Sequence, residues 1–198
     1  MPFLEPLSDE GVPSDILERF THYKNTRGFT PNSIKTMVRR PNIVRAFMQL
    51  NQAVLYEGTV REELKMLISL ISSQVAGCRY CQAHMANLSK IYEASEEKIS
   101  QVWNYANSEL FDESEKAALD IAYHGAMSPS QAKEQHFEAL SQYFNESEIV
   151  EIVATISLFG FLNRWNDTMA TELEDLPEKV AQSTIKDTFG WDIGKHEQ

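Results

Sequence analysis

The sequence of 198 residues contains few cysteines, little proline and no long apolar run. Proline is absent between Pro41 and Pro129, which favours helices over the short strands and frequent turns of a β-sandwich. No apolar segment approaches the roughly 20 residues that a transmembrane helix needs. Residues 1–11 lack the basic region and the hydrophobic stretch of a secretory signal. We therefore expect a cytoplasmic protein without a membrane partner.

Basic residues are also scarce relative to acidic ones. The chain has 18 Lys and Arg against 29 Asp and Glu, and its formal net charge is −11. Because an acidic surface repels phosphate backbones, we expect no nucleic-acid partner. The hydrophobic content of 42% and the charged content of 24% are ordinary for a globular protein with a sizeable core.

Helical signals account for most of the chain. Capping boxes, in which a side-chain oxygen and a carboxylate satisfy each other's free N–H groups, are predicted at 59–62, 112–115 and 145–148. An apolar run follows the first and the third of these boxes, and no segment has the alternating pattern of a strand. The sequence therefore predicts an all-α fold.

The length fits one domain with terminal extensions. We expect an N-terminal extension over 1–28, a helical domain over 29–170 and a C-terminal helical tail over 171–198. Segments 59–78 and 145–164 resemble each other, since each has a cap, an acidic first turn and a long apolar helix. This similarity suggests that the bundle contains a duplicated helical unit.

The chemistry-bearing motif is a cysteine pair followed by a histidine. Cys78 and Cys81 are the only cysteines, and a bridge between residues so close removes little chain entropy, so redox or metal chemistry is favoured over a structural staple. Gly77 ends the preceding apolar helix and Cys78 opens the next. The positive end of that helix dipole lowers a thiol pKa and favours the thiolate.

His84 lies about 60° around the same helix from Cys81, so its imidazole can take the thiol proton. Cys78 can attack a sulfenic acid on Cys81 and close a disulfide. These parts suffice for a peroxide-reducing cycle that needs no metal, flavin or haem.

Two other uses of the cysteine pair are less favoured. Cys, Cys and His are all zinc ligands, but Cys78 and His84 diverge by roughly 120° on one helix. A thioredoxin-like site needs a strand before the pair, and nothing else in the sequence supplies a sheet. The remaining histidines form no paired ligand motif; they are His22, His124, His136 and His196.

Segment 73–84, which reads Ser-Gln-Val-Ala-Gly-Cys-Arg-Tyr-Cys-Gln-Ala-His, resembles the cysteine segment of the alkylhydroperoxidase D and carboxymuconolactone decarboxylase superfamily. Segments 28–32 and 161–164 support the resemblance, which covers about residues 28–170 and is greatest to the peroxidase-related branch. The resemblance implies an alkylhydroperoxidase D-like helical bundle that assembles as a homo-oligomer, a dimer, trimer or hexamer. It implies Cys81 as the peroxidatic thiol, Cys78 as the resolving thiol and His84 in a proton relay.

Two positions depart from the family pattern. The family histidine usually follows the second cysteine by four residues, whereas His84 follows Cys81 by three. The family also places a relay glutamate twelve residues before the first cysteine, where this chain has Met66. Candidate substitutes for that carboxylate are Glu62, Glu63 and Glu151. The acidic residues at 172, 174 and 175 are expected to be solvated.

The predicted function is a cofactor-free, peroxiredoxin-type thiol peroxidase. Its substrate would be hydrogen peroxide or a small organic hydroperoxide, and a dithiol or protein reductant would recycle the disulfide. A thiol–disulfide adaptor or redox sensor with little peroxidase activity is the alternative, because Met66 cannot carry a proton. Lactone decarboxylation is a fold-level analogy only, because that branch lacks the redox pair.

Overall fold

The computed structural model describes residues 2–197, and within them every regular element is a helix. The elements are α1 (Ser14–Arg27), α2 (Asn32–Met37), α3 (Pro41–Leu55), α4 (Glu62–Ala76), α5 (Arg79–Ile91), α6 (Glu96–Gln101), η1 (Val102–Asn107), α7 (Glu113–Gly125), α8 (Glu134–Leu140), α9 (Glu146–Met169), α10 (Asp175–Thr184), α11 (Lys186–Phe189) and η2 (Gly194–His196). The all-α prediction is confirmed. None of the helices over 2–197 combines the length and apolarity needed to cross a bilayer.

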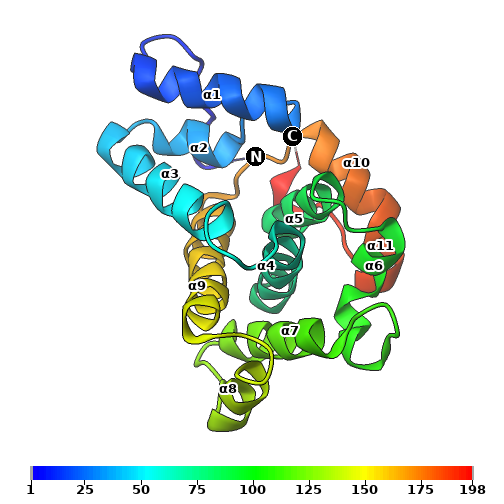
Figure 1. Cartoon of the computed structure of the whole chain (residues 1–198). Helices are drawn as coiled ribbons and strands as arrows, with labels where there is room; N and C mark the ends of the chain where they lie inside the picture. Colours follow the sequence, from blue (N-terminus) through cyan, green and yellow to red (C-terminus); the bar gives the residue numbers. More distant parts are fainter. Residues whose placement is uncertain (1, 198) are drawn as a thin grey trace.

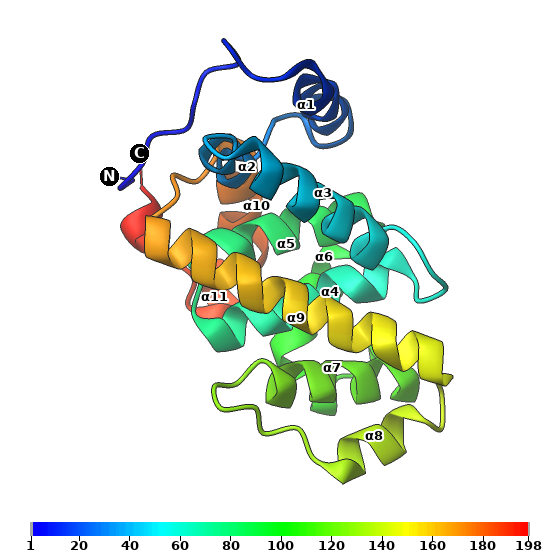
Figure 2. The same cartoon turned by 90° about the vertical axis from the view of Figure 1, so that its left-hand side faces the viewer.

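Helix α4 lies at the centre of the bundle and packs against α5, α7 and α9 (Figure 1). All ten of its residues from 64 to 73 are buried. A helix that is surrounded by others is apolar on all faces, which explains its nearly continuous apolar run. In Figure 2, α9 crosses the bundle in front of α4 and α5.

Helices α4 and α9 run parallel, with their N-termini at one end of the bundle. Near those N-termini, Glu151 on α9 pairs with Lys65 on α4, at 2.9 Å between Oε2 and Nζ. Near the C-termini, the Asn163 amide donates to the carbonyl of Ser72 at 3.3 Å. The similarity between 59–78 and 145–164 thus corresponds to two helices that lie side by side.

The capping boxes at 112–115 and 145–148 are confirmed, whereas the one at 59–62 is wrong. Helix α4 begins at Glu62 with Arg61 as its N-cap, and no side chain caps it. The carboxylate of Glu151 accepts the backbone N–H groups of Thr59 and Val60 instead, at 2.9 and 3.1 Å. A partner from α9 therefore replaces the local cap.

A tight turn joins α4 to α5 and sets the position of both cysteines. Gly77 has a left-handed backbone, with φ of 73°, and the N–H of Cys78 bonds to the carbonyl of Ser73. This pattern is the glycine C-cap of a helix, which reverses the chain without steric cost. Cys78 then becomes the N-cap of α5, as the sequence predicted.

Both predicted extensions contain helices with buried residues. In the N-terminal one, α1 buries Ile16, Phe20 and Tyr23, and in the C-terminal one, α10 packs against α5. The domain boundaries at 28 and 170 stay predictions, and the outermost residues of the two extensions, 1 and 198, lie outside the described part.

Candidate functional site

The two cysteines lie close together at the start of α5, as free thiols. Cys78 has no exposed surface and Cys81 is 2% exposed. The amide of Asn166, from α9, donates to the Cys81 sulfur at 3.3 Å. Two thiols and one amide therefore meet where α5 begins beside the C-terminal half of α9.

Burial sets the protonation of Cys81. It raises the pKa of this thiol well above its ordinary value, and the hydrogen bond and charge of Cys78 raise it further, whereas the Asn166 amide lowers it. The sequence predicted that the helix start lowers the thiol pKa, and this prediction is wrong for Cys81. Desolvation disfavours the thiolate more strongly than the helix dipole favours it.

His84 belongs to a second group of side chains, which includes Tyr80 and Glu174. Nε2 of His84 lies 2.7 Å from one carboxylate oxygen of Glu174, and the Tyr80 hydroxyl donates to the other at 3.0 Å. The two rings stack with centroids 4.3 Å apart, and Phe29 contacts His84 edge-on. In a neutral imidazole whose Nε2 proton faces this carboxylate, the lone pair is on Nδ1.

The neighbours of Tyr80 keep its hydroxyl neutral. Burial and the charge of Glu174 raise the pKa of Tyr80 well above its ordinary value. The backbone N–H of Ser33 donates to the same hydroxyl at 3.3 Å, and the N–H of Asn32 donates to Glu174. Residues from α2, α5 and the segment before α10 therefore fix the orientation of the histidine.

The structure places the three carboxylates that the sequence suggested as relay groups elsewhere. Glu62 and Glu63 are in the first turn of α4, whereas Cys78 follows its last turn. The fifteen residues of α4 span roughly 20 Å at 1.5 Å per residue, and this length separates the two carboxylates from the cysteine. Glu63 pairs with Lys98 at 3.0 Å, and Glu151 is held by the start of α4. The proposed substitutes for the family glutamate are therefore wrong in position.

Glu174 is the carboxylate that sequence reasoning missed. It was expected to be solvated, but its side chain is only 12% exposed and faces His84. It lies 90 residues after His84 and is the N-cap of α10. The only signal in the sequence is its place before an amphipathic helix, which does not identify a partner.

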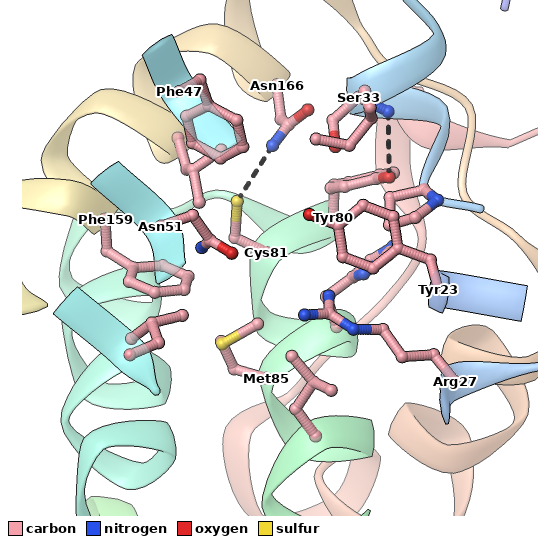
Figure 3. Close-up of a pocket in the computed structure, with 16 residues that line it drawn as sticks. Tyr23, Arg27, Ser33, Phe47, Asn51, Tyr80, Cys81, Met85, Phe159 and Asn166 are labelled. Carbon is pink, nitrogen blue, oxygen red and sulfur yellow. Dashed lines mark hydrogen bonds between the residues drawn. The ribbon is translucent and has the colours of Figure 1, made fainter. Parts of the chain in front are cut away.

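Cys81 and His84 line one narrow cavity of about 40 Å³ (Figure 3). A cavity needs roughly 10–15 Å³ of such space for each water molecule, so this one fits a few waters or a hydroperoxide group. In Figure 3 the Cys81 sulfur lies between Asn166, Asn51 and Met85. The lining is mainly apolar and includes Tyr23, Ile34, Phe47, Leu55, Leu88, Phe159 and Leu162.

A separate cluster outside this cavity brings Asp120, His124 and His136 within 4.8 Å of one another. Nδ1 of His136 accepts the backbone N–H of Lys133 at 2.8 Å, so the proton of the neutral ring is on Nε2. Nδ1 of His124 contacts the carbonyl of Asp120. The contact of His136 fits a helix-capping role, and both contacts leave Nε2 of the ring as an available ligand atom.

The family model described as "Carboxymuconolactone decarboxylase family" matches residues 41–124, which include the cysteines and the histidine. A curated relative, the uncharacterized protein YdfG of Bacillus subtilis (strain 168), is 24% identical over 112 residues, 56% of this chain and 74% of YdfG.

Solved structures of the debrominase Bmp8 are similar over nearly the whole chain. The apo form is 32% identical, with a TM-score of 0.84, and covers 91% of this chain and 96% of its own. A cysteine-to-alanine variant in complex with 2,3,4-tribromopyrrole is 31% identical over the same shares, with a TM-score of 0.85.

The alkylhydroperoxidase AhpD core of an uncharacterized peroxidase-related protein from Ralstonia eutropha JMP134 has the same fold. It is 24% identical, with a TM-score of 0.76, and covers 87% of this chain and 94% of its own. The chain therefore belongs to the carboxymuconolactone decarboxylase and alkylhydroperoxidase D superfamily of enzymes.

Proposed function

We propose that the protein is a dithiol-dependent reductase of hydroperoxides, in which Cys81 is the reacting thiol and Cys78 the resolving one. One observation carries the proposal: the Cys81 sulfur lines a cavity that also contains the His84 ring, with a second thiol beside it. The cavity accepts a small electrophile, and the neighbouring thiol supplies the second electron pair.

The reaction balances with these groups alone. The Cys81 sulfur attacks the distal oxygen of the hydroperoxide, the O–O bond breaks, and the products are a Cys81 sulfenic acid and an alcohol. The Cys78 thiol then attacks the sulfenic sulfur, releasing water and forming the Cys78–Cys81 disulfide. An external dithiol reduces that disulfide and returns both thiols.

Proton transfer is the task of His84 and Glu174. Because Cys81 is protonated at rest, its proton must leave as the S–O bond forms, and the departing alkoxide must gain one. The neutral His84 ring can take the first proton and give the second. Glu174 is a positioning residue that stabilises the imidazolium between these two steps, and Tyr80 holds the carboxylate in place.

Reductive debromination is a second candidate, favoured by the similarity to Bmp8 and by the aromatic lining of the cavity. The same thiols supply the electrons. Sulfur attack on bromine gives a Cys81 sulfenyl bromide, while the carbon that loses bromine takes up the proton. Attack by Cys78 then releases bromide and a proton and forms the same disulfide. A brominated pyrrole is larger than the narrow cavity, so this reaction requires the cavity to widen.

Turnover by single-cysteine variants tests the proposal. With a hydroperoxide and excess dithiothreitol, we expect Cys81→Ser to lose activity by about 1,000-fold or more, because no other thiol lines the cavity. Without dithiothreitol, Cys78→Ser should consume about one equivalent quickly and accumulate a sulfenic acid that dimedone traps at Cys81.

The matched control is Ser89→Ala, a buried hydroxyl on α5 that does not line the cavity. Bromide release from 2,3,4-tribromopyrrole, measured with the same variants, decides between the two candidates. Unchanged peroxide consumption in Cys81→Ser contradicts the peroxidase. Disulfide formation with only background turnover of both substrates favours the thiol–disulfide adaptor.

A further inference from the structure

A second, larger cavity adjoins the narrow one. Its volume is about 260 Å³, against about 40 Å³ for the cavity at Cys81. The two share four lining residues, Tyr23, Arg27, Asn51 and Leu88. The narrow space fits a reacting group, and the larger one beside it has room for the body of an organic substrate.

Arg27 lies on the shared wall, and aromatic residues hold it in place. Its guanidinium carbon is 4.7 Å from the centre of the Tyr23 ring and 5.9 Å from that of Tyr56, and it donates to the Tyr56 hydroxyl. In Figure 3 the guanidinium points into the pocket between Tyr23 and Met85. Cation–π contacts stabilise a guanidinium over its faces and leave its in-plane N–H donors available.

None of the carboxylates in residues 2–197 forms an ion pair with Arg27. Apart from Arg27 and three tyrosines, the titratable residues that line the larger cavity are Arg19 and His22, and both are exposed. No Asp or Glu lines either cavity, in a chain whose net charge is −11. A concave site lined by one sign of charge concentrates ligands of the opposite sign.

We propose that the substrate of Cys81 is an organic acid whose carboxylate binds Arg27. Its apolar body occupies the larger cavity, and its reducible atom enters the narrow one. A guanidinium fork matches a carboxylate in geometry, and the aromatic walls suit an apolar body. The inference rests on the proposed reductase function, because it names the substrate of the same thiol.

The test compares two hydroperoxides that differ in charge and by one methyl group, 4-(2-hydroperoxypropan-2-yl)benzoic acid and its methyl ester. We expect the wild-type protein to have a higher kcat/KM for the acid. In Arg27→Gln the ratio of acid to ester should fall by about 10- to 100-fold, mainly through KM, because one charge-assisted hydrogen-bond pair is lost. Arg27→Lys should restore part of the ratio, since it keeps the charge but not the fork.

The matched control is Arg40→Gln, which removes an exposed arginine that lines neither cavity and should leave the ratio unchanged. An unchanged ratio in Arg27→Gln overturns the inference. Melting temperatures of all variants show whether each one folds.

Binding of a ligand that cannot be reduced separates this inference from the proposed function. Calorimetry with 4-(2-hydroxypropan-2-yl)benzoate should give a Kd about 10-fold weaker for Arg27→Gln than for wild type. If the benzoate binds through Arg27 and no hydroperoxide is turned over, the proposed function fails and the anion site stands. If both hydroperoxides are turned over with no preference that depends on Arg27, the anion site fails and the reductase stands.

Discussion

The two ends of the parallel pair α4 and α9 differ in what their polar groups do. At the N-terminal end, Lys65 is 1% exposed and its ammonium is held by the Glu151 carboxylate and the carbonyl of Glu57. At the C-terminal end, the Cys81 thiol has one amide donor, Asn166, whose own oxygen has no hydrogen-bond partner among the described residues.

The difference shows how one pair of helices combines stability with reactivity. A buried ammonium without a carboxylate would be costly, so the charged end is fully paired. A neutral thiol is stable in an apolar site without further partners, so the other end can keep a reactive atom beside a cavity. Changes at the first end should therefore affect the free energy of unfolding, and changes at the second should affect catalysis.

The largest effect on stability is expected at the charged end. Glu151→Gln leaves the Lys65 ammonium buried without a counter-charge, and it should lower the free energy of unfolding by about 3 kcal/mol. The melting temperature should fall by roughly 6–12 °C for a chain of this length. The control is Lys116→Met, which removes a pair whose glutamate is 71% exposed and should cost less than about 1 kcal/mol.

Calorimetric unfolding of these variants and peroxidase assays at low temperature check whether the charged end affects stability and not catalysis. A large loss of kcat in folded Glu151→Gln would contradict it. Such a loss would also restore Glu151 as a relay group.

The next largest effect is expected for catalysis at Glu174. Glu174→Gln keeps the shape but removes the charge that stabilises the imidazolium of His84, so kcat should fall by roughly 100-fold. The melting temperature should change little. Steady-state kinetics measures the effect. The control variant is Glu172→Gln, two residues earlier in the same segment. A larger loss in Glu62→Gln than in Glu174→Gln would favour the position suggested by the sequence.

The smallest effect is expected at Asn166, and it depends on pH. Because the pKa of Cys81 lies above its ordinary value, the thiol is protonated at neutral pH and the rate should rise with pH. Asn166→Leu removes the donor that lowers this pKa, so the profile should move to higher pH and the rate at pH 7 should fall about 10-fold.

Asn163→Leu is the matched control for Asn166, because its amide bonds to the carbonyl of Ser72 and not to the sulfur. Rates of single-turnover oxidation from pH 6 to pH 10 measure the effect. A shift of the Asn166→Leu profile towards lower pH would show that the amide does not stabilise the thiolate.

Local patterns in the sequence predicted the features that depend on neighbouring residues. The glycine turn, the helix start at Cys78 and the position of His84 on the same helix follow from a segment of only twelve residues, 73–84. The capping boxes at 112–115 and 145–148 are equally local, and both are confirmed.

Features that depend on distant segments could not be predicted. Glu174 reaches His84 only because the chain turns back after α9, and Glu151 replaces the expected cap of α4 from 92 residues away. The direction of the pKa shift of Cys81 was missed for the same reason. Spacing reveals the helix dipole, but burial results from the packing of several helices around the thiol.

The complete burial of Cys78 has a consequence for how the proposed cycle restarts. A disulfide between Cys78 and Cys81 would lie beneath the turn at Gly77, where the thiol group of a large donor protein has no direct access to the resolving sulfur. A bulky donor can act only after that turn opens locally, whereas one thiol group of a small dithiol can reach the Cys81 sulfur through the cavity. The size of the electron donor, rather than the strength of the oxidant, then determines how fast the enzyme regenerates.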